Sequence, residues 1–502
     1  MEDIEDIAAG LAAAEVGERA PLGVLVRPRA AKASEDETRP EAAGVEPPPA
    51  AAAGAGVPGR ARVWSRTFGC SHNVSDGEYM EGALAAYGYS LVEQREDADV
   101  WLINSCTVKD PSQAAFVHLV QAGREQGKGV VVAGCVPQAD RGLKELEGVS
   151  MVGVTQIDRI VDVVEQTLSG ATVRLLGKKA LPQLDLPKVR RNKLVEIVPL
   201  STGCLGSCTY CKTKHARGKL GSYAPEAIEA RVEAVLDEGR AAAPGELVPR
   251  EIWLASEDTG AYGIDLKTSL PDLLARLTGL LERKGSPETM LRLGMTNPPF
   301  ILAHLDRLAE ALRHPNMFRF LHIPVQSGSN AVLTAMNREY TVEQFSLVAD
   351  YMLKHVPGLT LATDIICGFP GETDEQFEET LALVRKYRFP VVNISQFYPR
   401  PGTPAAKMRR VPTQVAKARS RALTALFESY EPYDALVGQV LPVWVSEEVS
   451  RDGAQTVAHT AGYVKVVLPR DDALRGRRLA VRVTAAAKFH VVAEPVADSD
   501  AA

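Results

Sequence analysis

The strongest constraint on the fold is an alternation of short apolar runs with longer helical patterns between residues 194 and 398. Six of these runs are rich in β-branched and aromatic residues, at 194–200, 251–255, 290–295, 318–324, 359–367 and 391–397. Repeated strand-helix units form a parallel sheet. The pattern therefore predicts an α/β domain whose sheet curls into a full or partial barrel, with its active site at the carboxyl ends of the strands.

Three cysteines, Cys204, Cys208 and Cys211, follow the first of these runs at spacings of four and three. On a helix they would form one buried stripe of small apolar residues. Gly203 and Gly206 lie within the stretch and favour a loop instead. A loop can wrap three thiolates around a compact inorganic centre, and three ligands leave one metal position open.

Two metal centres are compatible with this spacing. Structural zinc normally takes four closed ligands, and His215 is the convenient fourth ligand here. A 4Fe-4S cluster with one iron lacking a protein ligand is the other interpretation. The spacing favours the cluster but leaves the zinc site open.

Three more cysteines, Cys70, Cys106 and Cys135, follow strand-like runs at residues 63–68, 100–104 and 130–133. A single cysteine of this kind is commonly just a buried small residue. If the three runs are parallel strands of an open α/β sheet, however, their carboxyl ends share one edge, and the thiols converge there. The repetition predicts a second metal cluster.

Composition narrows the class of protein. Seven cysteines in 502 residues are too few for a disulfide scaffold, which favours a reducing compartment. No apolar stretch is long enough for a membrane span. The net charge of −6 lies mostly in the first 60 residues, so the rest of the chain is nearly neutral and can present a basic face locally.

The composition also suggests five segments. Residues 1–60 are rich in Ala, Pro and Glu and predict a disordered low-complexity tail. Residues 61–169 form the first α/β domain, 170–193 a proline-containing linker, 194–430 the barrel domain and 431–496 a small β-barrel. The end of the linker is basic, and both a solvated face and a phosphate-contacting role remain open for Lys188, Arg190, Arg191 and Lys193.

These motifs resemble one enzyme family. Cys204, Cys208 and Cys211, with Tyr210 before the third cysteine, resemble the motif of the radical S-adenosylmethionine (SAM) enzymes. The stretches around Cys70, Cys106 and Cys135 resemble the amino-terminal domain of the methylthiotransferases. The resemblance is closest to the branch acting on threonylcarbamoyladenosine in tRNA, and rests there on residues 212–218, 256–263, 363–373 and 398–406.

The resemblance implies a fold of three parts: an amino-terminal open parallel α/β domain, a central partial (β/α)6 radical SAM barrel, and a carboxyl-terminal TRAM-like RNA-binding β-barrel. It also implies a reaction, the addition of a methylthio group to C2 of N6-threonylcarbamoyladenosine just 3′ of the anticodon. One SAM would supply the radical and a second the methyl group, with the hard chemistry carried by the cofactors.

The same resemblance assigns site residues. Cys204, Cys208 and Cys211 would ligate the radical SAM cluster, while Cys70, Cys106 and Cys135 would ligate an auxiliary 4Fe-4S cluster. Glu257 would contact the amino group of SAM. The other expected SAM contacts are Tyr210, Asn297, Gln326, Ser327, Asp364 and Gly368. Candidates for binding tRNA phosphate or the substrate carboxylate are Lys212, Lys214, His215 and Arg217.

The implied partners are tRNA, a reductant protein and a sulfur source, in the cytoplasm. Animal members of the family add a carboxyl-terminal membrane anchor, and this sequence shows no such segment, so we do not expect attachment to the endoplasmic reticulum. Two alternatives remain. The same chemistry would act on isopentenyladenosine in tRNA or on a ribosomal protein, or the chain would be a non-catalytic zinc or RNA-binding protein.

Overall fold

The computed structural model describes residues 59–107 and 110–496, so the tail expected at residues 1–60 lies almost entirely outside the described part. The chain divides into two units between Arg191 and Asn192.

The first unit contains a six-stranded, fully parallel sheet in the order β2-β1-β3-β4-β5-β6. The three predicted strands are present, and β2, β5 and β6 extend the sheet at its edges. The strand bounds are β1 Arg62–Thr67, β2 Ser90–Leu91, β3 Val100–Ser105, β4 Gly129–Gly134, β5 Ser150–Val152 and β6 Arg174–Leu175.

Helices cover both faces of this sheet. Helices α2 (Ser71–Tyr87) and α5 (Ile160–Leu168) share one apolar core with Leu102 and its neighbours, while α3 (Asp110–Glu125) packs on the other face against Trp101. Successive residues of β3 thus enter opposite cores, as expected for a strand buried on both sides. The open parallel α/β domain predicted from the sequence is confirmed.

The segment 170–193 was expected to be a linker with a basic, accessible end. Instead, β6 pairs with β5, and Lys188 is fully buried, with its Nζ atom 3.1 Å from Glu78 Oε2 on α2. Arg190 is also buried, and Arg191 Nη2 lies 3.2 Å from Glu81 Oε1. Lys188 cannot contact phosphate in this structure, because its ammonium group is buried and paired with the Glu78 carboxylate.

The second unit begins with six parallel strands, whose positions match the six predicted runs. They are β7 Val195–Pro199, β10 Glu251–Ala255, β11 Met290–Leu293, β12 Phe320–His322, β13 Thr360–Cys367 and β14 Val391–Gln396. They form two three-stranded sheets, β11-β10-β7 and β12-β13-β14, joined by a parallel bridge between Leu291 and Met317. Among the described residues β7 and β14 are not paired, so the barrel is partial.

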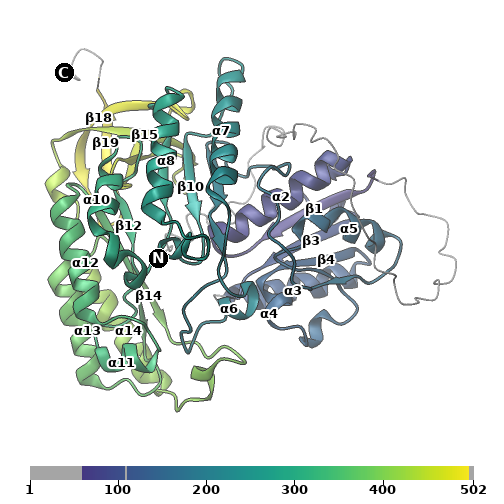
Figure 1. The fold of residues 1–502 in the computed structure, drawn as a ribbon, viewed down its shortest axis with the longest axis horizontal. Coiled ribbons are helices and arrows are strands. Elements are labelled where there is room, and N and C mark those ends of the chain that lie inside the picture. Colours follow the sequence, from purple (N-terminus) through teal and green to yellow (C-terminus); the bar gives the residue numbers. More distant parts are fainter. Residues whose placement is uncertain (1–58, 108–109, 497–502) are drawn as a thin grey trace. The chain divides into compact units, whose positions relative to one another are not determined.

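Long helices alternate with these strands, as the sequence pattern predicted (Figure 1). Both α12 and α13 begin with a capping box, at Thr341 and Thr373, which fixes where each helix starts. The helix bounds are α7 Pro225–Ala241, α8 Leu270–Arg283, α10 Leu305–Arg313, α12 Val342–His355, α13 Asp374–Tyr387 and α14 Thr413–Glu428.

A closed five-stranded barrel follows, in the order β15-β16-β17-β19-β18. β-rich runs at residues 440–445, 463–468, 479–484 and 489–492 predict four of its strands. They miss β16, whose pairing with β15 and β17 is needed for closure. The strand bounds are β15 Val440–Val449, β16 Gln455–Thr460, β17 Lys465–Pro469, β18 Arg478–Ala486 and β19 Val491–Pro495.

The small barrel packs against the amino ends of the partial barrel strands. Tyr463 Oη donates to Oε2 of Glu251, the first residue of β10, at 3.1 Å. Trp444 Nε1 donates to Glu288 O at 3.1 Å, just before β11. The small barrel therefore occupies the end opposite to the carboxyl ends where chemistry is expected. Within the described ranges, no helix is long and apolar enough to cross a bilayer.

Candidate functional site

The three cysteines of the first unit lie at the carboxyl ends of adjacent strands. Register pairs Thr67 of β1 with Asn104 of β3, and Asn104 with Ala133 of β4. Cys70, Cys106 and Cys135 come two or three residues after these paired positions. The predicted strand arrangement, with the three residues at one sheet edge, is therefore present.

Asn73, in the first turn of α2, joins the segments that carry these cysteines. Its Nδ2 atom donates to Phe68 O and Ser105 O, each at 2.8 Å, and its Oδ1 lies 3.7 Å from Cys135 Sγ. A Cβ atom on Gly69 would stand 2.6 Å from Cys106 Sγ, so only glycine fits there. The backbone is thus built closely around the thiols.

Cys204, Cys208 and Cys211 lie in the segment between β8 (Ser201–Thr202) and α6 (Thr213–Arg217). The segment is a loop, as Gly203 and Gly206 indicated. Cys204 Sγ and Cys208 Sγ lie 3.6 and 3.8 Å from where a Cβ on Gly206 would stand. Both thiols thus border the same glycine.

Protein surroundings hold two of these thiols in the protonated state. Burial, followed by the nearby Asp258 carboxylate, raises the pKa of Cys204 to about 12. Burial also raises the pKa of Cys208, although the Arg338 guanidinium opposes the effect. Metal binding releases such protons, because only the thiolate is a ligand.

A turn formed by residues 336–338, after α11 (Asn330–Ala335), supports the cysteine loop. Thr209 N donates to Met336 O at 2.9 Å, and Asn337 Nδ2 donates to Ser207 O at 2.9 Å. Arg338 Nη1 donates to Cys208 Sγ at 3.2 Å. No local sequence pattern predicts these contacts, because they join segments about 130 positions apart.

The strand ends bring several other polar groups to the loop. Asn297 Nδ2 donates to Asp258 Oδ2 at 2.7 Å, and Asn297 Oδ1 accepts from Arg338. Burial raises the pKa of Asp258 to about 6, although hydrogen bonds from Asn297 oppose this shift. Asn297 therefore lies between a carboxylate and a guanidinium beside Cys208.

Gln326 follows β12 and lies beside Asp364, which is within β13; Gln326 N donates to Asp364 O at 2.8 Å. Gln326 has a left-handed φ of 68° and forms an isolated bridge with Ile365. Asp364 Oδ1 lies 2.7 Å from His322 Nε2 and accepts from Asn393 Nδ2 at 2.8 Å. Burial alone would raise the pKa of Asp364, but His322 and Asn393 hold it below its usual value.

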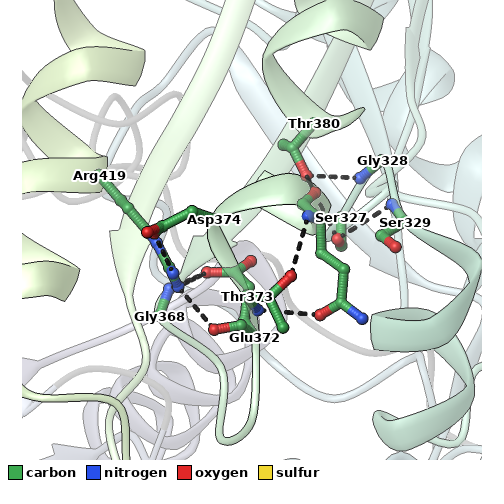
Figure 2. Close-up of polar contacts among 10 residues, drawn as sticks. Ser327, Gly328, Ser329, Gly368, Glu372, Thr373, Asp374, Thr380 and Arg419 are labelled. Atoms are coloured by element: carbon green, nitrogen blue, oxygen red, sulfur yellow. Dashed lines mark hydrogen bonds and ion pairs between the residues drawn. The ribbon is translucent and has the colours of Figure 1, made fainter. Parts of the chain in front are cut away.

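Two of the residues expected to contact SAM are engaged in internal contacts (Figure 2). Ser327 Oγ lies 3.3 Å from Thr380 Oγ1 and accepts from Ser329 N at 3.2 Å. Gly368 N donates to Glu372 Oε2 at 2.8 Å, and Arg419 Nη1 donates to the same oxygen at 2.8 Å. These bonds order the loops after β12 and β13.

Glu257 forms a buried ion pair with Arg217, in which Oε1 and Nε are 3.1 Å apart. This partner differs from the SAM amino group expected for Glu257, and it buries the guanidinium expected to reach tRNA. Lys212 is also buried, and its Nζ donates to Pro401 O at 2.7 Å. Lys214 Nζ donates to Leu205 O at 2.9 Å. Of the four candidates for contacting substrate, only His215 has an exposed side chain.

Comparison with protein families matches both units. Residues 62–153 match the uncharacterized protein family UPF0004, and residues 198–384 match the radical SAM superfamily. A threonylcarbamoyladenosine tRNA methylthiotransferase from Xenopus laevis is 49% identical, over 99% of this chain and 87% of the relative. A human relative of the same name is 51% identical, over 88% of this chain and 75% of the relative.

The chain belongs to the threonylcarbamoyladenosine tRNA methylthiotransferase family. Membership extends to archaeal sequences, since a probable threonylcarbamoyladenosine tRNA methylthiotransferase from Pyrococcus abyssi is 38% identical, over 81% of this chain and 93% of the relative. A radical SAM methyltransferase, TsrM from Kitasatospora setae, shares the fold. Its TM-score is 0.50 at 13% identity, over 68% of this chain and 76% of TsrM.

Membership in this family implies a 4Fe-4S cluster and SAM. The donors of this threonylcarbamoyladenosine tRNA methylthiotransferase homologue fit such a cluster, because three cysteines lie in one loop between β8 and α6, two of their thiols border Gly206, and Arg338 donates to one of them. In the described part of the chain, no three Cys, His, Asp or Glu side chains are arranged to hold a single metal ion. This holds equally for His215 with its neighbouring cysteines and for the two sets of three cysteines.

Sequence reasoning missed three residues of this site. Arg338 and Tyr340 follow a short helix, where no pattern distinguishes them from a solvated turn. Asp258 lies in the stretch 256–263 that contributed to the family resemblance, but its burial beside Cys204 was not foreseen. Only the folded chain brings these residues to the cysteines.

Proposed function

We propose that this chain is a radical SAM enzyme that adds a methylthio group to C2 of N6-threonylcarbamoyladenosine, just 3′ of the anticodon in tRNA. The observation that carries the proposal is identity near 50% to relatives named for this reaction, over at least three quarters of their length. The cysteine loop at the carboxyl ends of the partial barrel supports it, because barrels of this kind place their chemistry there.

Cys204, Cys208 and Cys211 would hold the radical SAM cluster. A 4Fe-4S cluster bound with SAM supplies one electron that splits SAM and yields a radical able to remove hydrogen from an unactivated carbon. The chain contributes orientation and electrostatics. Asn297, held by Asp258, and the backbone around Gln326 line the strand ends where SAM would bind, so these are the SAM contacts that the geometry favours.

Cys70, Cys106 and Cys135 would hold the auxiliary 4Fe-4S cluster, which would carry the sulfur to be transferred. A second SAM would methylate this sulfur. The support is the shared edge of β1, β3 and β4 and the close packing of Gly69 against Cys106. The reaction requires two further partners, a reductant protein and a sulfur source.

For tRNA, we assign initial contact to His215, which is exposed beside the cysteine loop, and to the TRAM-like barrel of residues 431–496. Several basic side chains of that barrel already have acidic partners: Arg470 Nε lies 2.6 Å from Asp472 Oδ1, and Arg475 Nη2 lies 3.1 Å from the same oxygen. Arg477 and Arg478 are exposed and are the better candidates for phosphate contact.

The proposal is tested with anaerobically reconstituted full-length protein, SAM, sulfide and a low-potential reductant. Three substrates are supplied in parallel: tRNA containing threonylcarbamoyladenosine, tRNA containing isopentenyladenosine, and a ribosomal protein. Nucleoside and peptide mass spectrometry should show a methylthio product only with the first. A product on either of the others, with none on the first, would assign the chain to a different substrate class.

A further inference from the structure

We infer that Arg338 sets the reduction potential of the cluster at Cys204, Cys208 and Cys211, by fixing a positive charge and an N–H donor against the Cys208 sulfur. The inference rests on the proposed function, because it requires a 4Fe-4S cluster at these thiols. It concerns a positioning residue that acts through a ligand atom.

The geometry places one guanidinium across several acceptors at the site. Arg338 Nη1 lies 3.2 Å from Cys208 Sγ and 3.5 Å from Tyr210 Oη. The other terminal nitrogen, Nη2, donates to Asn297 Oδ1 and lies 3.5 Å from Pro324 O. The planar fork thus reaches a cluster ligand with one arm and the strand-end network with the other.

Tyr340 prevents the guanidinium from turning away. Arg338 Nε donates to Tyr340 Oη at 3.2 Å, and the guanidinium carbon lies 4.9 Å from the centre of the Tyr340 ring. Tyr340 Oη in turn lies 2.7 Å from Pro324 O and 3.0 Å from Val325 O. The donor to Cys208 is therefore held in place before any cluster binds.

The charge on Arg338 is permanent. An arginine is not deprotonated in proteins. The positive charge is thus present whatever the state of the ligands.

Hydrogen bonds to sulfur and local charge are two of the factors that set iron-sulfur potentials. Reduction by a low-potential one-electron donor adds one negative charge to the sulfur-ligated iron at this loop, and breaks no bond. Arg338 stabilises that added charge more than it stabilises the oxidised state, because the attraction grows with the negative charge it faces. Its removal should therefore make the cluster harder to reduce.

The test uses the full-length chain with Cys70, Cys106 and Cys135 replaced by alanine, so that one cluster remains. Anaerobic redox titration followed by electron paramagnetic resonance, without SAM, gives the midpoint potential. We expect Arg338→Gln to shift it to more negative values, Arg338→Lys to shift it less, and Tyr340→Phe to shift it least. Arg292→Gln is the matched control, because Arg292 lies over the Tyr463 and Phe320 rings rather than at the loop.

Iron analysis of the chain that carries only the Cys70, Cys106 and Cys135 replacements, the parent of the variants, tests the cluster separately from the role of Arg338. If this parent binds no iron-sulfur cluster, the cluster of the proposed function is refuted. Bound cluster with an unchanged potential in all three variants would overturn the role of Arg338 alone. An unchanged potential with weakened SAM binding would make Arg338 a SAM-binding residue instead. Cluster loss in all three variants would show that Arg338 assembles the site, which also overturns the inference.

Discussion

Lys188 and Glu78 form a fully buried ion pair, with 3.1 Å between Nζ and Oε2. Lys188 Nζ also lies 3.3 Å from Ser75 Oγ and 4.8 Å from the centre of the Tyr79 ring. All three partners lie on α2, the helix that starts beside Cys70. The pair thus holds the last residues of the first unit against α2, the helix that follows Cys70.

Removing one member of this pair should destabilise the first unit strongly. Lys188→Met leaves the Glu78 carboxylate buried without its ammonium partner. Such a loss typically lowers the free energy of unfolding by about 3 to 5 kcal/mol. Faster hydrogen exchange at the α2 amides of the full-length protein would report this loss. The exposed Lys178→Met is the control and should change little. If Lys188→Met instead lowered only the affinity for tRNA, the phosphate-contacting role would return.

The two sets of cysteines should contribute equally to iron content. Anaerobically reconstituted protein should hold about eight irons per chain, and replacing either set by alanine should leave about four, since each three-thiol set ligates one 4Fe-4S cluster. Iron, sulfide and zinc analysis of both triple variants measures this. A content of four irons in the wild type, unchanged in the Cys70/Cys106/Cys135 variant, would contradict a cluster in the first unit.

Asp258 should make the stability of the cluster-free protein pH-dependent. Its pKa of about 6 in the folded chain exceeds the value near 3.9 expected when unfolded. Between these values the folded state holds a proton that the unfolded state has lost, so stability should fall as the pH rises from about 4 to about 6. Thermal unfolding across this range, compared with Asp258→Asn, measures the effect. An identical pH profile in the variant would rule out Asp258 as the cause.

Gly368 should tolerate no side chain. Its φ of 74° is strained for other residues, and an added Cβ would stand 2.6 Å from Ala416 Cβ on α14. We expect Gly368→Ala to lower the free energy of unfolding by at least about 1 to 2 kcal/mol, because alanine is strained in the left-handed backbone conformation. A double-mutant cycle with Ala416→Gly separates the clash from the backbone strain, because only the clash is relieved. Additive unfolding energies would show that the contact with Ala416 does not matter.

Strands could be placed from the sequence wherever the apolar run was long and its period clear. All six barrel strands were predicted, because their runs of β-branched and aromatic residues alternate with longer helical patterns. Strand β16 was missed since Gln455, Thr456 and His459 weaken its apolar pattern, although most of the strand is buried by its neighbours. Edge strand β6, with only two residues, carries no pattern at all.

The parts of the candidate site formed by residues close together in sequence were predicted. The contacts between residues far apart in sequence were missed. The cysteine spacing is local, and the loop that Gly203 and Gly206 indicated is present. The burial of Lys188 could not be foreseen, because a charged residue in a basic segment is usually solvated. Arg338 could not be foreseen either, since its contact with Cys208 depends on a turn distant in sequence folding against the loop.

The small barrel covers aromatic and charged groups of the second unit whose exposure to water would destabilise that unit. Tyr463 and Trp444 cover Phe318, and Tyr463 satisfies the buried Glu251 carboxylate. A truncated translation product ending before Val440 would expose these aromatic and charged groups together. Chaperones bind proteins that expose such a surface, and proteases degrade them. Nonsense mutations in this last segment should therefore lower the amount of protein in the cell rather than yield a smaller working enzyme.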